Sequence, residues 1–280
     1  MATPLEAWRD TLRELGVMGL VRPEAVEVPA PQELPAGGRR LEAGVPRPEI
    51  PAAAPKRPIP AKPAREAPPA SGPYTPPTDP VGYPPPEAVA GASTLAALEA
   101  AIRGCLKCPL GPGRLSFVFG EGDPGAGLMF IGEGPGRDED LQGRPFVGKA
   151  GELLDKMIGG LQLTRGQVYI ANVVKCRPPD NRTPAPEESQ ACLGYLRRQI
   201  ELIQPKVIVT LGATPLRELL GVKEGITKVR GQWQRLDLGG RAIPVMPTFH
   251  PAYVLRQYTQ DVRRAVWEDL KSAKGELDRA

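Results

Sequence analysis

The chain has 280 residues, with 36 Lys and Arg against 32 Asp and Glu and a formal net charge of +4 at pH 7. A basic excess of this size permits a phosphate-binding surface without requiring one. No apolar run approaches the length that spans a bilayer, which excludes a membrane-spanning protein. The first twenty residues also lack the continuous apolar stretch of a secretory signal, so we expect a cytoplasmic protein.

Residues 1–94 have the composition of a disordered extension. They hold 21 of the 35 prolines and long stretches of Ala, Pro and Gly. Such a segment buries too little apolar surface to offset the entropy cost of ordering it. We therefore expect two parts, a Pro/Ala-rich disordered extension over residues 1–94 and a folded domain over residues 95–280. The domain carries the basic excess, with 26 basic against 21 acidic residues.

One short amphipathic helix is predicted inside the extension, at about residues 4–16. Its apolar side chains recur at helical spacing, at Leu5, Trp8, Leu12 and Leu15. A helix of this kind on a long tether suits docking to a protein partner. The alternative is a transient helix without a partner, since isolated helices of this length are marginal in water.

Strands and helices alternate through the predicted domain. Short apolar runs predict strands over residues 128–132, 167–175, 205–212 and 241–249. Helical patterns cover residues 150–161, 187–203, 213–220 and 261–271. Such alternation is typical of a mostly parallel sheet with helices on both faces. We expect an α/β fold, a three-layer α/β/α sandwich around a central, mostly parallel, four-stranded sheet.

The first predicted strand runs directly into G-E-G-P-G at residues 132–136. Its glycines let the backbone approach a flat ligand closely, and loops after parallel strands form the ligand crevice of such folds. The segment is not a nucleotide phosphate loop, because it lacks that pattern and is rich in acidic residues such as Glu133 and Glu139. The alternative is a structural turn whose acidic residues cap the next helix.

Three side chains near the predicted strand ends are candidates for binding a base. The amide of Asn172 can read a base edge that presents an N–H beside a C=O, or it can bond to local backbone. Phe146, which lies between glycines, is either a stacking platform or a core residue. His250 is the only histidine and can donate a hydrogen bond to a leaving group, or it is structural.

The segment after His250 carries Val254, Leu255 and Arg256. Two apolar side chains beside a cation suit insertion into a DNA base stack with a contact to phosphate. The alternative is the start of an ordinary helix.

Four cysteines form a second group of candidates. They stand in C-L-K-C, after the second predicted strand, and in a predicted helix, at Cys105, Cys108, Cys176 and Cys192. In a reducing cytosol they are better explained as metal or cluster ligands than as two disulfides. Their spacing fits zinc and iron–sulfur equally.

Together these motifs resemble the family 4 uracil-DNA glycosylases. The resemblance rests on G-E-G-P-G-x-x-E-D, G-R-P-F-V-G-x-A-G, A-N-V-V-K-C-R-P-P-x-N-R-x-P and H-P-A-Y-V-L-R, and it covers roughly residues 95–275. This family consists of bacterial and archaeal repair enzymes with a [4Fe-4S] cluster. The resemblance implies excision of uracil from DNA by hydrolysis of the N-glycosidic bond, which leaves an abasic site and begins base excision repair.

The resemblance also implies roles for individual residues. The four cysteines match the ligands of a structural [4Fe-4S] cluster. Phe146 matches the residue that stacks on the flipped uracil, Asn172 the one that reads its Watson–Crick edge, and His250 the one that contacts O2. Backbone N–H groups of the neighbouring uracil-binding segment are expected to help His250 stabilise the negative charge on O2, and this segment is Gly134, Pro135 and Gly136.

Two acidic positions complete the implied catalytic set. The resemblance pairs Glu139 with Asn172, and Glu133 with Asn181. Of the two carboxylates, we expect Glu133 to stabilise the positive charge on the sugar and to position water. Val254, Leu255 and Arg256 are expected to contact DNA while the base is flipped.

Two competing functions are disfavoured. A related subgroup crosslinks to DNA through a histidine in an Arg-rich insert, but residues 225–231 contain neither the insert nor a histidine. A non-catalytic iron–sulfur DNA-binding protein would not need Glu133, Asn172 and His250 together. We expect a prokaryotic, nucleoid-associated monomer whose partner is uracil-containing DNA, single- or double-stranded.

Overall fold

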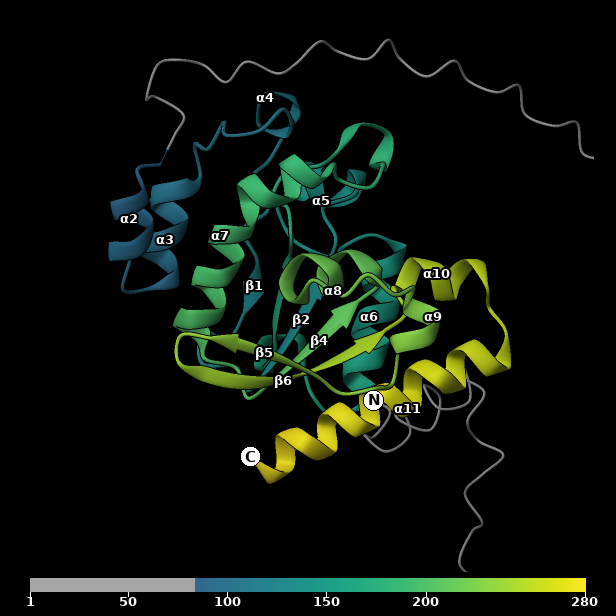
Figure 1. The fold of residues 1–280 in the computed structure, drawn as a ribbon. Helices are drawn as coiled ribbons and strands as arrows, with labels where there is room; N and C mark the ends of the chain where they lie inside the picture. The colour runs from purple at the N-terminus through teal and green to yellow at the C-terminus, as the bar shows by residue number, and fades with distance from the viewer. Residues whose placement is uncertain (1–83) are drawn as a thin grey trace, which may run out of the picture. The chain divides into compact units, whose positions relative to one another are not determined.

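The computed structural model describes residues 84–280, which belong to one compact unit (Figure 1). The helix predicted at residues 4–16 and nearly all of the predicted extension lie outside the described residues. Within residues 84–280, no helix is long and apolar enough to cross a membrane.

A six-stranded mixed sheet forms the centre of the domain, in the order β1-β3-β2-β4-β6-β5. Its strands are β1 (Glu121–Gly122), β2 (Leu128–Gly132), β3 (Tyr169–Asn172), β4 (Val207–Leu211), β5 (Gln234–Leu238) and β6 (Arg241–Thr248). The four inner strands β3, β2, β4 and β6 run parallel to one another. They are the four strands that the sequence predicts.

Both edge strands are antiparallel to their neighbours and were not predicted from the sequence. The sheet therefore has six strands where four were expected. β5 and β6 form a hairpin, since Leu238 pairs with Arg241 across a two-residue turn. Gly239 and Gly240 make that turn with φ of 58° and 75°, a left-handed conformation that glycine adopts without steric cost.

The predicted helices correspond to α6 (Lys149–Gly160), α7 (Pro186–Ile203), α8 (Ala213–Leu220) and α11 (Gln260–Arg279). Shorter helices add to them: α2 (Pro86–Gly91), α3 (Leu95–Ile102), α4 (Leu110–Gly113), α5 (Arg137–Gln142), α9 (Ile226–Val229) and α10 (Pro251–Arg256). Two 3-10 turns, η1 (Arg165–Gln167) and η2 (Pro179–Asn181), precede and follow β3.

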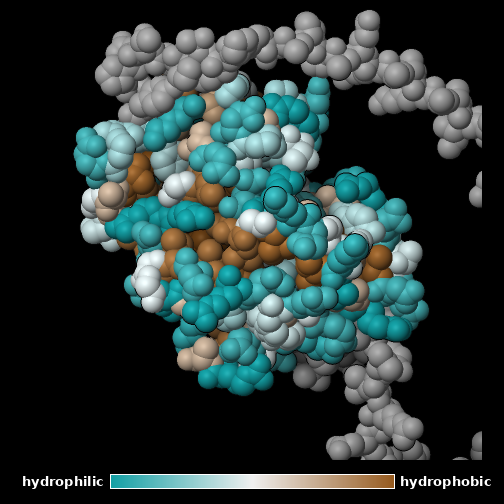
Figure 2. Space-filling view, viewed as in Figure 1, coloured by the Kyte–Doolittle hydropathy of each residue, from teal (hydrophilic) through white to brown (hydrophobic). Residues whose placement is uncertain are grey.

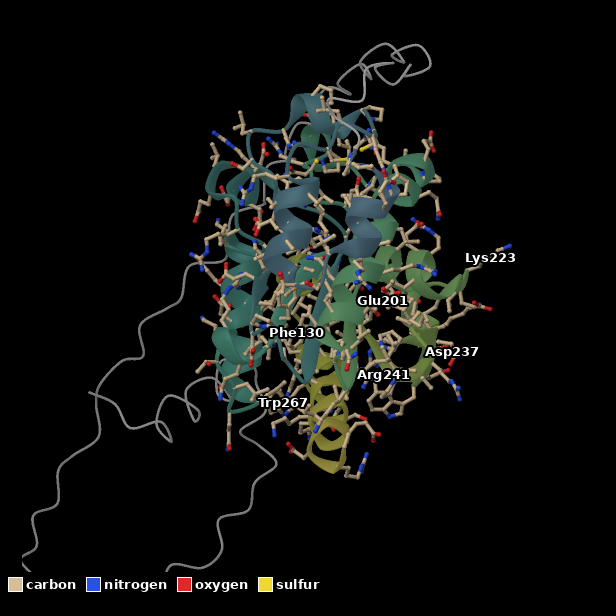
Figure 3. The ribbon with its side chains drawn as sticks, turned by 90° about the vertical axis from the view of Figure 1, so that its left-hand side faces the viewer. Phe130, Glu201, Lys223, Asp237, Arg241 and Trp267 are labelled. Atoms are coloured by element: carbon tan, nitrogen blue, oxygen red, sulfur yellow. The ribbon has the colours of Figure 1, made fainter. Side chains whose placement is uncertain are left out.

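Alternating side chains of the sheet enter two separate cores. Met129 and Ile131 of β2 pack in the core with α3 and α7, whereas Leu128 and Phe130 pack in the core with α6 and α11. Figure 1 shows these helix pairs on opposite sides of the sheet. The side view in Figure 3 places Phe130 inside the domain and Lys223 pointing outward. The three-layer α/β/α sandwich predicted from the sequence is confirmed.

The packed structure begins before α3. Helix α2 lies upstream of residue 95 and contacts α3 and α7. Ala92 is buried, and its carbonyl accepts a hydrogen bond from Arg198 Nη2 of α7 at 2.7 Å. The side chain of Thr94 caps α3 by accepting the Ala97 N–H at 3.1 Å. Residues 84–94 thus pack against the domain instead of behaving as free linker.

One rim of the α7 core is only partly covered. Leu202, Leu220 and Leu238 come from α7, α8 and β5 and lie partly buried against that core. Figure 2 shows a band of apolar surface over the part of this face where Figure 1 draws α8 and β5.

Candidate active site

A cleft of about 780 Å³ opens at the carboxyl ends of the parallel strands. The segments that follow all four strands line it, as the fold class predicts. It brings together all the residues predicted to bind uracil or to catalyse its excision, and one of the three predicted DNA contacts: Glu133, Gly134, Pro135, Gly136, Glu139, Phe146, Asn172, Asn181, His250 and Arg256.

Asn172 is the last residue of β3 and lines the cleft. Its side chain is 2 % exposed, and Oδ1 is buried with no hydrogen-bond partner among residues 84–280. A Cβ atom on Gly132 would collide with this oxygen and with the ring of Phe146, so glycine is needed there. A buried amide oxygen without a partner costs about 1–3 kcal/mol. Asn172 therefore has an unused acceptor beside the cleft.

Phe146 lies beside this amide in an uncommon backbone conformation. Its φ of 50° is in the left-handed region, which a residue with a bulky side chain rarely adopts. The ring is buried, and its centroid lies 5.7 Å from that of His250 with 32° between the planes. Phe146 and His250 thus border the same space from two different loops.

His250 caps α10 in one defined tautomer. Its Nδ1 accepts the Ala252 N–H at 3.1 Å, which leaves the ring proton on Nε2. Burial, together with the nearby positive charge of Arg256, lowers the pKa of His250 from 6.5 to about 4, while Glu139 opposes this shift. At neutral pH the side chain is therefore an uncharged N–H donor at the cleft.

Glu139 acts on backbone, which differs from the pairing that the resemblance implies. Its Oε2 accepts the Gly136 N–H at 3.0 Å, and its Oε1 accepts the N–H groups of Val147 and Gly148 at 2.9 and 3.0 Å. This carboxylate ties the glycine-rich segment to the Phe146 loop. The implied pairing with Asn172 is absent from the described structure.

Glu133 also has a partner other than the implied one. Its Oε2 accepts a hydrogen bond from Thr214 Oγ1 at 2.5 Å. Asn181 Oδ1 instead accepts Arg177 Nε at 2.7 Å. Thr214 is buried at the start of α8 and lines the cleft, and it was missed from the sequence. The only hint was its place directly after a predicted strand, in L-G-A-T.

The glycine-rich segment offers fewer backbone donors than expected. Pro135 has no N–H, and the N–H of Gly136 is donated to Glu139. Of the three residues predicted to face uracil, only Gly134 therefore keeps an N–H for a ligand.

The predicted DNA wedge is corrected at one position. Val254 is fully buried in the core with α6 and α11, so it cannot enter a base stack. Leu255 is 40 % exposed and remains available, and Arg256 lines the cleft. Tyr258, two residues further on, is also exposed.

The four cysteines lie in one region on the α7 side of the sheet. All four are free, and Cys108 packs against the buried cluster that contains the other three. Two of the sulfurs accept hydrogen bonds: Cys176 Sγ from Arg114 Nη1 at 3.3 Å, and Cys105 Sγ from the Lys107 N–H at 3.4 Å. The Tyr195 hydroxyl also lies 3.1 Å from Cys105 Sγ. Hydrogen-bond donors of this kind stabilise sulfur that carries negative charge.

Burial raises the pKa of Cys108, that of Cys176 to about 11 and that of Cys192 to about 12. These three thiols therefore stay protonated at neutral pH in the absence of a ligand. A bound metal deprotonates such thiols outright. Among residues 84–280, no set of three or more Cys, His, Asp or Glu side chains is arranged around a single-ion position.

The sequence family model of the uracil DNA glycosylase superfamily matches residues 119–271 of this chain. This range includes the cleft residues described above and two of the four cysteines, Cys176 and Cys192. Fold and cleft together are those of this superfamily.

Relatives narrow the assignment. The type-4 uracil-DNA glycosylase of Thermotoga maritima is 51 % identical over 62 % of this chain and 89 % of its own length. The enzyme of the same name from Saccharolobus solfataricus is 46 % identical over 63 % of this chain and 83 % of its own. The enzyme of the same name from Archaeoglobus fulgidus is 43 % identical over 63 % of this chain and 89 % of its own length. The chain belongs to the type-4 uracil-DNA glycosylases, hydrolases of the N-glycosyl bond.

Proposed function

We propose that the cleft binds a uracil base flipped out of DNA and hydrolyses its N-glycosidic bond, leaving an abasic site as the first step of base excision repair. The observation that carries this proposal is the unpartnered Oδ1 of Asn172, buried beside the Phe146 ring and below the cleft. A base with an N–H at the matching position satisfies that oxygen.

The amide of Asn172 distinguishes uracil from cytosine. Its Oδ1 accepts the N3–H of uracil, and its Nδ2 donates to O4. Cytosine presents an unprotonated N3 and an amino group at these positions, so both contacts become mismatches. The ring of Phe146 covers a face of the base, which adds stacking that does not depend on sequence.

Departure of uracil places negative charge on O2, and His250 is the donor that stabilises it. The neutral imidazole already carries its proton on Nε2, so no prior protonation is required. A fixed donor aimed at developing charge is typically worth a hundredfold or more in rate. The N–H of Gly134 is a second donor from the same side of the site.

Glu133 is the carboxylate that we assign to the sugar side of the reaction. Its bond to Thr214 fixes one carboxylate oxygen and leaves the other to position water or to face the positive charge on the sugar. Glu139 has a supporting role, because its oxygens already hold three backbone N–H groups. Asn181, bonded to Arg177, belongs to the rim of the cleft and not to the group that reacts.

Leu255 and Arg256 are the contacts that we assign to DNA beside the flipped base. The exposed leucine fills the space that the base leaves in the stack, and the arginine meets phosphate at the cleft mouth. This chemistry serves both single- and double-stranded DNA, although only a duplex needs the wedge.

A [4Fe-4S] cluster is the cofactor that we propose for the cysteine region. Three buried thiols and the partly buried Cys108, with donors beside the sulfurs of Cys105 and Cys176, fit an iron–sulfur cluster. Cys105, Cys108, Cys176 and Cys192 would hold the cluster. The cluster would hold the loop after β3 against α3 and α7. It supplies structure, and excision requires only hydrogen bonds and water.

The remaining proposals concern the rest of the chain. We infer that the enzyme acts as a cytoplasmic, nucleoid-associated monomer and that residues 1–94 supply no catalytic group. Any contribution of the helix at residues 4–16 would come from docking to a protein partner, which raises the local concentration of the enzyme.

The test is an excision assay on matched oligonucleotides. Full-length protein is incubated with end-labelled DNA that carries one uracil, thymine or cytosine at the same position, without added metal or nucleotide. Alkali then cleaves any abasic site. We expect cleavage at uracil only. If the protein bound the uracil strand without cleavage after alkali, it would be a DNA-binding protein, and the enzymatic assignment would be rejected.

A further inference from the structure

Two charged side chains hold the backbone around Phe146. On the cleft side, Glu139 accepts the N–H groups of Val147 and Gly148, the two residues after Phe146, at 2.9 and 3.0 Å. From η1, Arg165 Nη1 donates to the carbonyl oxygen of Phe146 at 3.2 Å, and Nη2 donates to the carbonyl of the preceding proline. A carboxylate and a guanidinium therefore fix consecutive peptide groups on both sides of one residue.

Arg165 is itself fixed in place. Its Nε donates to Glu121 Oε1 and its Nη1 to Asp155 Oδ1, each at 2.9 Å. The side chain is only 18 % exposed. A guanidinium has five N–H donors in a rigid plane, so it can bind two carbonyls and two carboxylates at once, which an ammonium cannot. Arg165 does not line the cleft and cannot touch a bound base.

The held backbone is one that Phe146 would not adopt freely. A left-handed conformation is sterically unfavourable for a residue with a side chain, and it persists only where the surroundings impose it. A relaxed Phe146 would move its ring away from His250 and from the amide of Asn172. The strain therefore serves the position of the ring.

We propose that Arg165 is a positioning residue for uracil excision, which acts by clamping the Pro145 and Phe146 carbonyls so that the Phe146 ring stays over the base. This inference rests on the proposed stacking role of Phe146. It assigns a function to a side chain that lies outside the cleft and approaches the loop from η1.

The chain offers a matched control in Arg144. This residue belongs to the same loop and binds Glu121 through two hydrogen bonds of 2.7 Å. Its side chain is 56 % exposed, and no bond from it to a carbonyl of the loop is seen among residues 84–280. Arg144→Met therefore removes a cation that binds Glu121, as Arg165 does, but it removes no hydrogen bond to the Pro145 or Phe146 carbonyl that is seen among the described residues.

The test is a double-mutant cycle between Arg165 and Phe146 in the full-length enzyme. Single-turnover excision rates are measured for wild type, Arg165→Met, Phe146→Ala and the double variant. We expect Arg165→Met to slow excision about tenfold in wild type. In the Phe146→Ala background the same change should slow it less than about twofold, because no ring remains to be positioned. Arg144→Met should keep the wild-type rate.

Three results would overturn the proposal. They are an equal loss from Arg165→Met in both backgrounds, an equal loss from Arg144→Met, and no loss from Arg165→Met. If Arg165→Met fails to fold, Arg165→Lys takes its place in the cycle, because it keeps the positive charge beside Glu121 and Asp155 but not the planar fork. An inactive wild-type enzyme would instead reject the proposed function, so the two failures are distinguishable.

Discussion

The cleft and the cysteine region differ in whether their polar atoms have hydrogen-bond partners. In the cleft, the Oδ1 of Asn172 has no partner in the part of the chain that the structure describes, and His250 carries its ring proton on Nε2. In the cysteine region, the sulfurs of Cys105 and Cys176 already have donors beside them and lie within an apolar core. Unsatisfied polar atoms suit a ligand that comes and goes, whereas satisfied and enclosed ones suit a permanent group.

The largest expected effect tests the unsatisfied amide. Asn172→Asp should slow uracil excision about a thousandfold or more, because a carboxylate cannot donate to O4 and repels it. Single-turnover rates and unfolding midpoints are measured together. A folded variant that keeps the wild-type rate on uracil would show that the amide does not read the base.

The next effect concerns the donor to O2. His250→Ala should lose on the order of a hundredfold in the single-turnover rate, since a preorganised donor is removed. His250→Gln serves as the control because its amide N–H can replace part of the hydrogen bond. Equal rates for all three proteins would remove His250 from the reaction.

Substitutions in the cysteine region should lower the stability of the protein and leave the chemistry of the cleft to the residues described above. Cys176→Ala should lose bound iron and visible colour together with a clear drop in the unfolding midpoint. Val173→Ala is the control, because it removes packing from the same buried segment but no ligand. Zinc in place of iron in anaerobically purified wild-type protein would contradict the proposed cofactor.

A smaller effect follows from the lowered pKa of His250. Between pH 6.5 and about 4 the unfolded chain binds a proton that the folded protein does not, so the folded state loses stability as pH falls through this window. Wild type should lose up to about 2 kcal/mol more than His250→Gln between pH 6.5 and 5. Thermal unfolding of both proteins across this range measures the difference. Parallel curves would mean that the imidazole titrates normally.

No effect on excision is expected from the extension. A shortened chain of residues 84–280 keeps α2 against α3 and α7, so it should excise uracil from a short oligonucleotide at the full-length rate. A marked loss, with no other protein present, would place part of the extension in the enzyme itself.

The sequence predicted the parts of the fold that repeat a pattern and missed those that depend on one turn or one contact. The four parallel strands follow from apolar runs, whereas β5 was missed although Gly239 and Gly240 mark a hairpin turn. Val254 and Leu255 are adjacent apolar residues that the sequence does not distinguish. The packing of α10 on α6 buries Val254 and leaves Leu255 exposed.

The site shows the same division. The residues that the motifs place after strands line one cleft, since strand ends converge in this fold class. The partners of the two glutamates were not predictable from spacing. Thr214 and Arg165 approach from α8 and η1, and only the folded chain brings them to Glu133 and to the Phe146 loop.

The most direct measurement of the central claim is a crystal structure of the full-length protein with free uracil. We expect the base in the cleft with its N3–H within hydrogen-bond distance of Asn172 Oδ1, its face against the Phe146 ring, and O2 beside His250 Nε2. Uracil bound elsewhere, or bound in the cleft with Oδ1 still unpartnered, would contradict the account.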